Sequence, residues 1–504
     1  MLRKLILGVV GLVLLLVGAA AALTTFDSRF QISNWRMVFA ALTGMDGQSP
    51  TATTVGQSLH VRPGYAVALY ATTMPKARML RLTAAGDLLV SQPRLGQISV
   101  LGRDANGDGL PDRQEILIGG LDRPNGIDFL DGWLYIAEGS AVGRVRFDVA
   151  NGRVDGSYQR ILTGIPEGGN HWTRTLRVGP DGWLYLSIGS SCNVCIETHA
   201  WRAAMIRFRP DGSGAELFAS GLRNSVGFDW APWSGELIAT DNGRDLLGDD
   251  FPPCELNRIT AGGFYGWPHR NGFGVSDPDF GVADSELLKR AINPVHGFRA
   301  HNAPLGIHFL RSPNLPADMQ RSALVALHGS WNRSMADGYK VVQLHWDDAG
   351  KIVESDFLSG FERNGNVIGR PVDIAEAADG SLFISDDYAG AIYRVIKSGK
   401  ATVANATAPI IRPLHAGDPL REVSAGERSK SAEVAKSLMQ KYACVSCHIP
   451  GTPTADKWRS LAERYTLTEL TEYFLVPTPP MPVLPLSAGE RRTLAIHLLA
   501  TGGR

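Results

Sequence analysis

Gly132-Trp133-Leu134-Tyr135-Ile136, followed by Gly143-Arg144-Val145-Arg146-Phe147, is one copy of a pattern that recurs along the chain. Each copy reads as a turn, a short apolar strand, a polar or glycine-rich loop and an alternating strand. Further copies begin at Gly86, Gly182, Gly235 and Gly380, roughly every 45–60 residues apart from one long gap that holds Ser322 to Leu344. We expect this gap to contain a further unit. Such units arranged in a ring predict an all-β, six-bladed β-propeller over residues 55–398.

Four inter-strand loops of this region are rich in His, Arg and Asn. Because the loops of a propeller converge on one end of its channel, we expect them to share a site. Converging guanidinium groups and a lysine suit a planar ligand with several carboxylates, and a single histidine among them can act as a general base. Taken singly, each residue is also typical of a structural position. The loops are Gly168–Trp172, Gly221–Ser225, His328–Arg333 with Tyr339-Lys340 close behind, and Gly369–Pro371.

Near the C-terminus, Cys444-Val445-Ser446-Cys447-His448 is a Cys-x-x-Cys-His motif. This motif predicts a covalent c-type haem, bound through the thiols of Cys444 and Cys447, with His448 as an axial iron ligand. Met481, in the proline-rich stretch 479–482, is the predicted second iron ligand. A redox Cys-x-x-Cys or half of a zinc site is the alternative, but for zinc no second pair of ligands follows at suitable spacing.

Helical patterns flank the haem motif. Residues 432–442 read as one helix, and a capping box at Ser487 and Glu490 opens another over 491–501. Helix, haem motif, methionine loop and terminal helix follow the order of a small class I cytochrome c, which residues 425–504 resemble. We therefore expect a linker over residues 399–428 and an all-α cytochrome c domain over residues 429–504.

The N-terminus has a positive flank at Arg3 and Lys4, then an uncharged run from Leu5 to Leu23. This pattern reads as a secretory signal, with small residues for cleavage at 19–22. The run is also long enough to span a bilayer uncleaved. We expect residues 1–25 to be a signal peptide or membrane anchor and residues 26–54 a connector. The expected location is the periplasm, which agrees with a covalent haem; anchoring to the inner membrane through residues 5–23 stays open.

The composition gives no sign of a nucleic-acid partner, because Lys plus Arg and Asp plus Glu number 50 each. A length of 504 residues favours two or three domains. In an oxidising compartment, Cys192 and Cys195 are expected to form a local disulfide, with a redox role as the alternative. Cys254 is then left without an obvious partner.

The segment from Asp104 to Glu115 fits a calcium-binding loop with a glycine at its sixth position. A hairpin turn without metal is the alternative. The expected oxygen ligands are Asp104, Asn106, Asp108, Asp112 and Glu115.

Several motifs occur in the order found in the glucose/sorbosone dehydrogenase family of six-bladed propellers that bind pyrroloquinoline quinone (PQQ), which the propeller region resembles. They are Asn170-His171, Gly182–Tyr185, Leu222-Arg223-Asn224, Glu255–Asn257 and Tyr265–Pro268. Three further stretches resemble the sorbosone dehydrogenase branch in particular: Asp241–Asp245, His328–Arg333 and Gly369–Val372.

The resemblance implies roles for the matching positions. His171 would be the general base that takes the substrate hydroxyl proton, and Arg223 would stabilise charge on the reduced quinone oxygen. His301 is expected either to line the pocket or to be a structural histidine. The remaining implied cofactor contacts are Asn125 and Asn224 to the quinone, Arg370 with Arg333 or Lys340 to its carboxylates, and Gly243, Glu255 and Tyr265 to a calcium ion.

Together these features predict an exported quinohaemoprotein dehydrogenase that oxidises an aldose, aldehyde or related alcohol. Electrons would pass from PQQ to the fused haem and then to an external acceptor, which could be a cytochrome, a quinone or an oxidase. Two alternatives remain open: a metal-dependent lactonase on a similar propeller, and a non-enzymatic ligand-binding or electron-transfer protein.

Overall fold

The chain divides into two compact units, Met1–Thr407 and Ala408–Arg504. The computed structural model describes residues 31–34, 43, 47–281, 286–313, 315–398, 418–421, 423–442, 461, 465–474, 484 and 486–501. The predicted signal or anchor over residues 1–25 and the predicted haem residues Cys444, Cys447, His448 and Met481 lie outside this described part. Among the described residues, no helix is long and apolar enough to cross a membrane.

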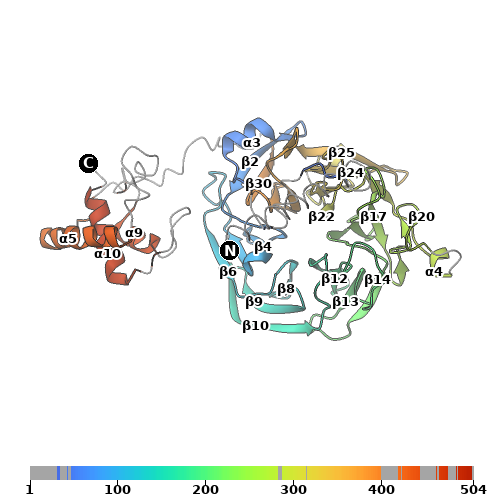
Figure 1. Cartoon of the computed structure of the whole chain (residues 1–504), viewed down its shortest axis with the longest axis horizontal. Helices are drawn as coiled ribbons and strands as arrows, with labels where there is room; N and C mark the ends of the chain where they lie inside the picture. Colours follow the sequence, from blue (N-terminus) through green and yellow to red (C-terminus); the bar gives the residue numbers. More distant parts are fainter. Residues whose placement is uncertain are drawn as a thin grey trace, which may run out of the picture. The chain divides into compact units, whose positions relative to one another are not determined.

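The first unit is a ring of six sheets of four or five strands, counted over the described residues, which confirms the predicted six-bladed propeller (Figure 1). Blade 1 holds β3 (Leu80–Leu82), β4 (Leu88–Gln92), β5 (Gln97–Leu101) and β6 (Gln114–Ile118), and blade 2 holds β7 (Ile127–Leu130), β8 (Trp133–Ala137), β9 (Ala141–Asp148) and β10 (Arg153–Thr163). Blade 3 holds β11 (Arg174–Val178), β12 (Leu184–Ile188), β13 (Ala204–Phe208) and β14 (Glu216–Ser220), with β18 (Gly263–Phe264) added in parallel to β14.

The other three blades complete the ring. Blade 4 holds β15 (Phe228–Trp230), β16 (Leu237–Asp241), β17 (Cys254–Ile259) and β21 (His296–Phe298). Blade 5 holds β22 (Pro304–Phe309), β23 (Ser322–Leu327), β24 (Lys340–Trp346), β25 (Ile352–Ser359) and β1 (His60–Val61), and blade 6 holds β28 (Pro371–Glu376), β29 (Leu382–Asp386), β30 (Ala391–Lys397) and β2 (Tyr65–Ala71). Short elements outside the blades are α3 (Ala52–Ser58), α4 (Glu286–Lys289), the 3-10 turns η2 (Pro93–Leu95) and η3 (Ala317–Met319), and the hairpins β19–β20 (Arg270–Asn271, Val275–Ser276) and β26–β27 (Glu362–Arg363, Asn366–Val367).

The repeated sequence pattern corresponds to the second and third strands of five blades. These strands are apolar because both of their faces are covered by neighbouring blades: β4, β12 and β29, for example, are buried along their whole length. The long gap in the repeat contains blade 5, as predicted. The inner strands approach closely, since a Cβ on Gly126 would lie 2.2 Å from the backbone nitrogen of Leu176 in the next blade.

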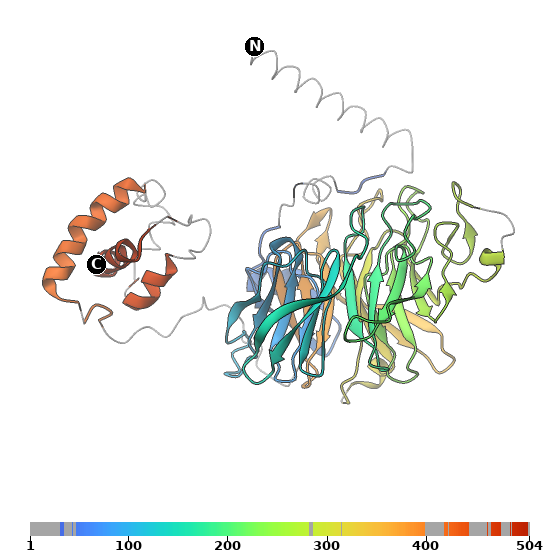
Figure 2. The same ribbon diagram turned by 90° about the horizontal axis from the view of Figure 1, so that it is seen from below.

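The ring is closed by a strand from the N-terminal side. Strand β2 pairs antiparallel with β30, from Tyr65 opposite Lys397 to Ala71 opposite Ile392. Blade 6 is therefore built from both ends of the propeller sequence, so the first and last blades cannot separate without breaking this ladder. Figure 2 shows the blades from the side, with their strands running between two ends of the ring.

The second unit is a small helical bundle. Its helices α5 (Ala425–Lys441), α9 (Leu467–Tyr473) and α10 (Ala488–Thr501) enclose an apolar core that includes Leu438 and Leu494. The predicted capping box before α10 is present, because Ser487 N donates to Glu490 at 2.7 Å and Glu490 N donates to Ser487 Oγ at 3.3 Å. The assignment of this unit as a class I cytochrome c stays a prediction.

Replacing Ile384 by alanine tests the packing between blades. Ile384 is fully buried in β29, whereas Ile116 in β6 is 62% exposed and offers the same chemical change at a surface position. We expect Ile384→Ala to cost about 2–5 kcal/mol of unfolding free energy and Ile116→Ala less than about 1 kcal/mol. Urea or thermal unfolding followed by tryptophan fluorescence measures both. Equal losses in the two variants would contradict the buried-blade packing described above.

Candidate functional site

The predicted site residues gather at one end of the ring because of the strand order. In a blade of four antiparallel strands, the loop between strands 2 and 3 and the connection to the next inner strand lie at the same end, which we call the site end. Each connection ends directly before an inner strand. The residues that these connections carry are Arg78 before β3, Asn125 before β7, His171 before β11, Arg223 and Asn224 before β15, His301 before β22, and Arg370 before β28.

His171 is half-buried and has a defined tautomer. Its Nδ1 lies 2.9 Å from the carbonyl oxygen and 2.8 Å from Oγ of Ser190, and the Ser190 hydroxyl donates to the Cys192 carbonyl at 2.7 Å. Both Ser190 oxygens must therefore accept, so Nδ1 carries the proton and Nε2 keeps its lone pair. Loss of hydration and the charge of Arg223 lower the pKa of His171 to about 3, which keeps the imidazole neutral.

Arg223 is buried, and its guanidinium binds several partners in the chain. Its Nε donates to the carbonyl oxygen of Asn193 at 2.9 Å, its Nη1 to that of Asn242 at 3.0 Å, and its Nη2 to Asn193 Oδ1 at 2.8 Å. Nη2 also lies 3.4 Å from Asp245. These contacts fix the charge of Arg223 beside His171, whose pKa it lowers.

Gly189 lets His171 and Asn224 approach each other. A Cβ at this position would lie 2.6 Å both from Asn224 Oδ1 and from His171 Cβ, closer than real side chains allow. The backbone of Asn224 is also held in place, because its N–H donates to the Asp241 carboxylate at 2.5 Å. The absence of a side chain at position 189 is thus what brings the two predicted site residues together.

His301 joins the same cluster through Asp245. Its Nε2 lies 2.8 Å from the carbonyl oxygen of Gly248, and its Nδ1 lies 3.5 Å from Asp245. Burial opposes ionisation of Asp245, but the hydrogen bond from His301 and the charge of Arg223 outweigh it and lower the pKa of Asp245. We call His171, Arg223, Asn224, Asp245 and His301 the His171 cluster. His301 is buried, and whether it lines the pocket or is a structural histidine stays open.

A second group at the site end surrounds Arg370. Its Nε donates to the carbonyl oxygen of His328 and its Nη2 to that of Gly329, both at 3.1 Å. His328 in turn lies 2.8 Å from Asp387, which also pairs with Arg78 at 2.7 Å. Burial and the neighbouring Arg370 lower the pKa of His328 to about 4. The Arg78 guanidinium stands over Trp172, next to His171, at 5.4 Å from the ring centre.

Two asparagines at the same end have buried amide oxygens without a hydrogen-bond partner among the described residues. These oxygens are Asn125 Oδ1 and Asn302 Oδ1. Asn125 donates its Nδ2 to Arg174 O at 3.3 Å, so its amide is held while its oxygen stays available. Buried carbonyl oxygens are rarely left without a donor, and this arrangement therefore fits a ligand with polar groups of its own.

The structure does not bring Lys340 and Arg333 into these clusters. Lys340 lies in the third strand of blade 5, and its ammonium pairs at 2.7 Å with Asp356 on the outer strand β25. Arg333 is buried and ties two loops together, because it donates to the carbonyl oxygens of Asp249 and Ala300 and pairs with Asp250 at 3.1 Å. Both are cations of the type that binds carboxylates, but in this structure their charged groups bind partners within the chain.

The predicted calcium ligand Glu255 has a partner that sequence reasoning missed. Glu255 in β17 lies directly opposite Asp241 in β16. Loss of hydration raises the pKa of Asp241 to about 7, and loss of hydration together with the charge of Asp241 raises that of Glu255 to about 8. Gly243 follows two residues after Asp241, and buried Tyr265 follows β18. Two facing carboxylates form a site where a hard cation would be stabilised.

The other predicted calcium loop lies at the opposite end of the ring, in the connection between β5 and β6. Its side chains bind partners in the chain: Asp104 pairs with Arg394 at 2.7 Å, Asp112 accepts from Ala105 N at 3.1 Å, and Asn106 accepts from Asp108 N at 2.8 Å. Glu115 pairs with Arg113 at 3.1 Å. Calcium binding here stays a prediction, distinct from the site end.

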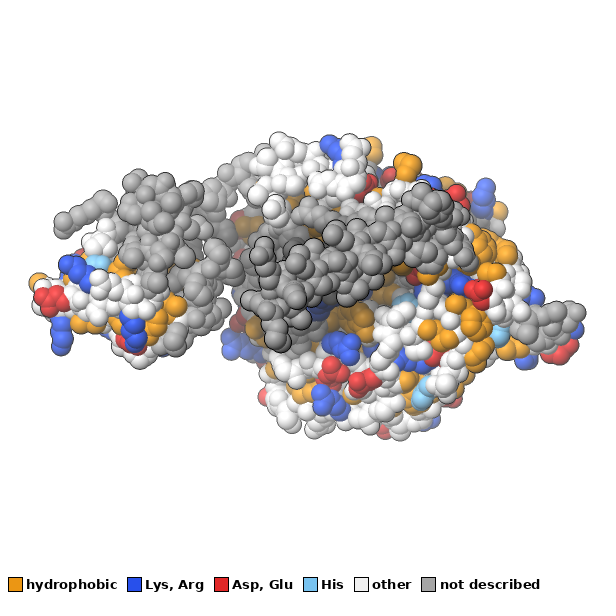
Figure 3. Space-filling model, in the orientation of Figure 1, with side chains coloured by type: hydrophobic (Ala, Val, Ile, Leu, Met, Phe, Trp, Pro, Cys, Tyr) orange, Lys and Arg blue, Asp and Glu red, His pale blue; other side chains and the backbone are white. Residues whose placement is uncertain are grey.

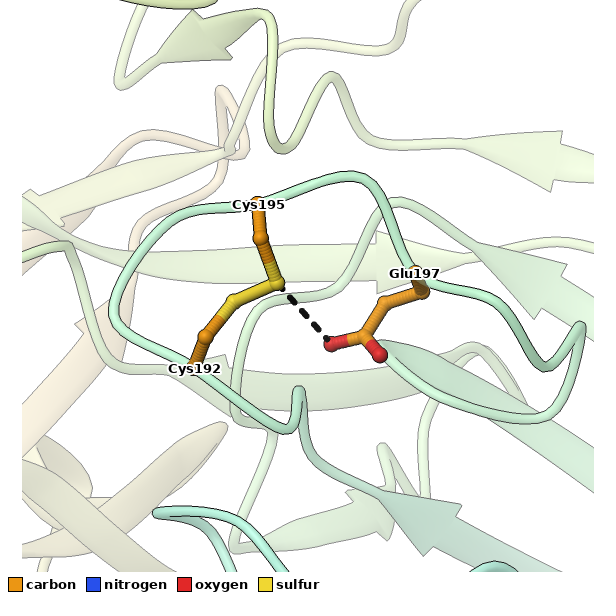
Figure 4. Close-up of side chains that lie close together, drawn as sticks. All are labelled: Cys192, Cys195 and Glu197. Atoms are coloured by element: carbon orange, nitrogen blue, oxygen red, sulfur yellow. Dashed lines mark hydrogen bonds between the residues drawn. A yellow bond between two sulfur atoms is a disulfide. The ribbon is translucent and has the colours of Figure 1, made fainter.

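Within the described part of the chain, one group of three His, Cys, Asp or Glu ligand atoms lies within 4.8 Å of one another: Cys192, Cys195 and Glu197. Cys192 and Cys195 form the predicted disulfide, so they are not free metal ligands (Figure 4). Cys254 is a buried free cysteine. On the face of the propeller visible in Figure 3, basic and acidic side chains are interspersed, in keeping with the balanced composition.

Comparison with known proteins gives a family for the propeller. A family model described as TrAA12-like matches residues 59–251 and 272–398. An uncharacterized protein of Borreliella burgdorferi is 35% identical over 290 residues, which cover 55% of this chain and 76% of that protein. The PQQ-dependent pyranose dehydrogenase of Coprinopsis cinerea is 24% identical over 437 residues, 72% of this chain, but the match spans only 57% of that relative.

Solved structures share the fold. A Trichoderma reesei structure of Carbohydrate-Active Enzymes Family AA12 superposes with a TM-score of 0.59 at 22% identity, covering 68% of this chain and 98% of that one. The holo form of the pyranose dehydrogenase PQQ domain from Coprinopsis cinerea gives 0.56 at 22% identity, covering 67% and 96%. At these identities the likeness establishes the propeller architecture.

The facing carboxylates predict a pH-dependent stability. Because the pKa values of Asp241 and Glu255 are raised in the folded state to about 7 and about 8, the folded protein keeps protons that the unfolded chain has released. The metal-free protein should therefore lose stability as the pH rises from about 4 to about 8. Glu255→Gln should flatten this loss, and exposed Glu216→Gln should not. The unfolding free energy of each variant, measured at a series of pH values with and without calcium, gives this pH dependence.

Calcium should raise the unfolding temperature of the wild type more at pH 8 than at pH 5, and only slightly in Glu255→Gln. A calcium response that is unchanged in this variant would place the ion elsewhere.

Proposed function

The chain belongs to the TrAA12-like family of PQQ-dependent, sugar dehydrogenase-like propellers, and we propose that it is an exported quinohaemoprotein dehydrogenase that oxidises an aldose, aldehyde or related alcohol. The observation that carries the proposal is His171, a half-buried neutral imidazole whose Nδ1 is held by Ser190 while Nε2 keeps its lone pair. This is the state that a general base needs before it takes a hydroxyl proton.

The site end fits PQQ by the chemistry of its donors. Arg370 would hold a carboxylate, since its guanidinium is already fixed by two carbonyl oxygens. Asn125, with an unpartnered amide oxygen, and Asn224 would contact the ring system. Arg223 supplies a fixed positive charge in the same cluster. When bound, PQQ supplies an electron-accepting quinone that takes two electrons from the substrate carbon.

The chain's own residues supply the proton chemistry. His171 Nε2 takes the proton of the substrate hydroxyl, and the imidazolium that results is stabilised by the two Ser190 oxygens that accept from Nδ1. Asp245, whose low pKa keeps it ionised, offsets the Arg223 charge that otherwise opposes this protonation. Arg223 in turn stabilises negative charge that develops beside it.

Electrons leave the propeller through the second unit in this proposal. The Cys-x-x-Cys-His motif at Cys444, Cys447 and His448, with Met481, supports a covalent haem c, and the chain itself tethers the haem to the propeller at a high effective concentration. An external cytochrome, quinone or oxidase would accept the electrons that such a haem carries. The apolar run over residues 5–23 supports export to the periplasm, as a cleaved signal or as a retained anchor.

Calcium completes the proposed cofactor set. At the site end, Glu255 and Asp241 would hold the ion, with oxygen atoms of Gly243 and Tyr265 nearby in sequence. The loop 104–115 would hold a second, structural ion that stiffens blade 1 at the other end.

Haem reduction tests the whole proposal. In purified, haem-loaded full-length protein supplied with calcium and PQQ, sugars and aldehydes should reduce the haem, and omission of PQQ should prevent it. His171→Asn should slow substrate-dependent reduction by about 100-fold or more, while the haem spectrum and its reduction by a chemical reductant stay unchanged. His60→Asn, at an exposed histidine of β1, is the control. Full activity of His171→Asn would remove the catalytic assignment.

A haem that is reduced chemically but by no substrate, in a protein that also fails to bind PQQ, would favour the non-enzymatic ligand-binding protein.

The low pKa of His171 predicts the acid limb of the rate profile. A base is active in its unprotonated form, so kcat/KM should not fall near pH 6.5, as it would for an ordinary histidine, but well below it, toward about pH 3. Arg223→Gln should move this limb to higher pH, because the Arg223 charge opposes protonation. Because unfolded His171 takes up a proton that the folded state excludes, stability falls as the pH drops from about 6.5 toward about 3, before the rate limb is reached. Brief acid exposure with initial rates separates the two effects.

A further inference from the structure

One short loop between β12 and β13 contacts both His171 and Arg223, the two residues to which the proposed function assigns the proton transfer and the charge stabilisation. This loop, Ser190–Glu197, contains the disulfide between Cys192 and Cys195. Ser190 is fully buried, and its two oxygens receive the Nδ1 proton of His171. The Ser190 hydroxyl cannot donate to the imidazole, because it donates to the carbonyl oxygen of Cys192 at 2.7 Å. The Ser190 carbonyl can only accept and so requires the proton on Nδ1, and the Cys192 carbonyl makes the Ser190 hydroxyl favour the same tautomer.

Asn193, which lies between the two cysteines, performs the equivalent task for Arg223. Its backbone and side-chain oxygens accept from the guanidinium at 2.9 and 2.8 Å. Its side chain also brackets Asp245, accepting from the backbone N–H at 2.8 Å and donating to the carbonyl oxygen at 3.1 Å. Asn193 thereby aligns the Arg223 guanidinium with the Asp245 carboxylate.

The loop is packed tightly and anchored at its far end. Ser191 donates its N–H and its hydroxyl to the Glu197 carboxylate at 2.6 and 2.9 Å, and its carbonyl oxygen accepts from Asn170 N at 2.9 Å. A Cβ on Gly169, two residues before His171, would lie 2.2 Å from that carbonyl oxygen. Figure 4 shows the Glu197 carboxylate facing the Cys195 sulfur, at 3.9 Å.

We propose that the Ser190–Glu197 loop is the positioning element of the active site. Its disulfide is required to hold the side chains of His171 and Arg223 in the orientations that these hydrogen bonds define. The proposal rests on the function proposed above for His171. The carbonyl of Cys192 and both oxygens of Asn193 lie within the four residues that the disulfide closes into a ring, so the bond restricts the same backbone that makes these contacts. Ser190 and Asn193 act through His171 and Arg223 and are positioning residues.

Thiol–disulfide exchange with a reductant opens the ring and removes the restraint on the loop backbone. A dithiol reductant delivers two electrons and two protons, which break the sulfur–sulfur bond and give two thiols, while the reductant becomes a disulfide. Both cysteines are half-buried, in contrast to the fully buried Cys254, so the bond is the more accessible target. The oxidised protein is then the active form.

The test uses the full-length holoprotein. A sample is reduced with dithiothreitol, capped with iodoacetamide and desalted, and its kcat and KM are compared with those of untreated protein. Cys192→Ser/Cys195→Ser removes the bond permanently, Asn193→Ala removes a positioning side chain with the bond intact, and Cys254→Ser controls for the third thiol. We expect kcat to fall about 100-fold after reduction and in the double variant, with KM nearly unchanged. Reductant should have no further effect on the double variant.

A second readout needs neither PQQ nor turnover. Nitrogen-15 NMR of histidine-labelled protein, with His171→Asn to assign the signal, reports which ring nitrogen carries the proton. We expect the Nδ1–H form in the oxidised wild type and a mixture of tautomers after reduction. Wild-type kcat together with an unchanged tautomer in a folded double variant would overturn the proposal. If His171→Asn itself retains full turnover, the proposed function fails, whereas the tautomer measurement still decides whether the loop orients the imidazole.

Discussion

The pairing of β2 with β30 is the constraint on which the rest of the structure depends. It ties a strand from the start of the propeller sequence to the last blade and so converts a row of sheets into a closed ring. Only in a closed ring do six inner strands face a common axis, and only then do the connections before them end near one another. The buried second strands, such as β12 and β29, make this ring rigid because both of their faces are packed.

The site end makes chemical use of this rigidity. Its arginines are held by backbone carbonyl oxygens of loops from other blades, as Arg370 is by His328 and Gly329 and Arg223 is by Asn193. Such contacts fix a charge without neutralising it. Loss of hydration, together with the fixed cation beside it, lowers the pKa of His171, which is the physical basis for a neutral base at this position. The same ring leaves two facing carboxylates, Asp241 and Glu255, whose ionisation the protein opposes unless a cation is present.

The sequence predicted the propeller correctly, and the site residues it selected stay predictions. The repeat placed the strands of five blades, and the long gap correctly predicted a sixth. Loops rich in His, Arg and Asn correctly pointed to one end of the ring, but residue type alone could not say which cations face the site. Lys340 pairs with Asp356 on an outer strand. Conversely, Asp387 and Arg78 join the site from loops whose short sequences gave no signal.

The sequence by itself determined the blades, the disulfide pair, the helical C-terminal unit and the haem motif, because each follows from local pattern or from residues close together in the chain. Only the tertiary structure decided that Ser190 orients His171, that Asn193 aligns Arg223 with Asp245, and that Asp241 faces Glu255. These contacts join residues from separate loops or strands, and their chemistry depends on burial and distance. Neither quantity is written in the spacing of residues; both arise when the closed ring brings the loops together.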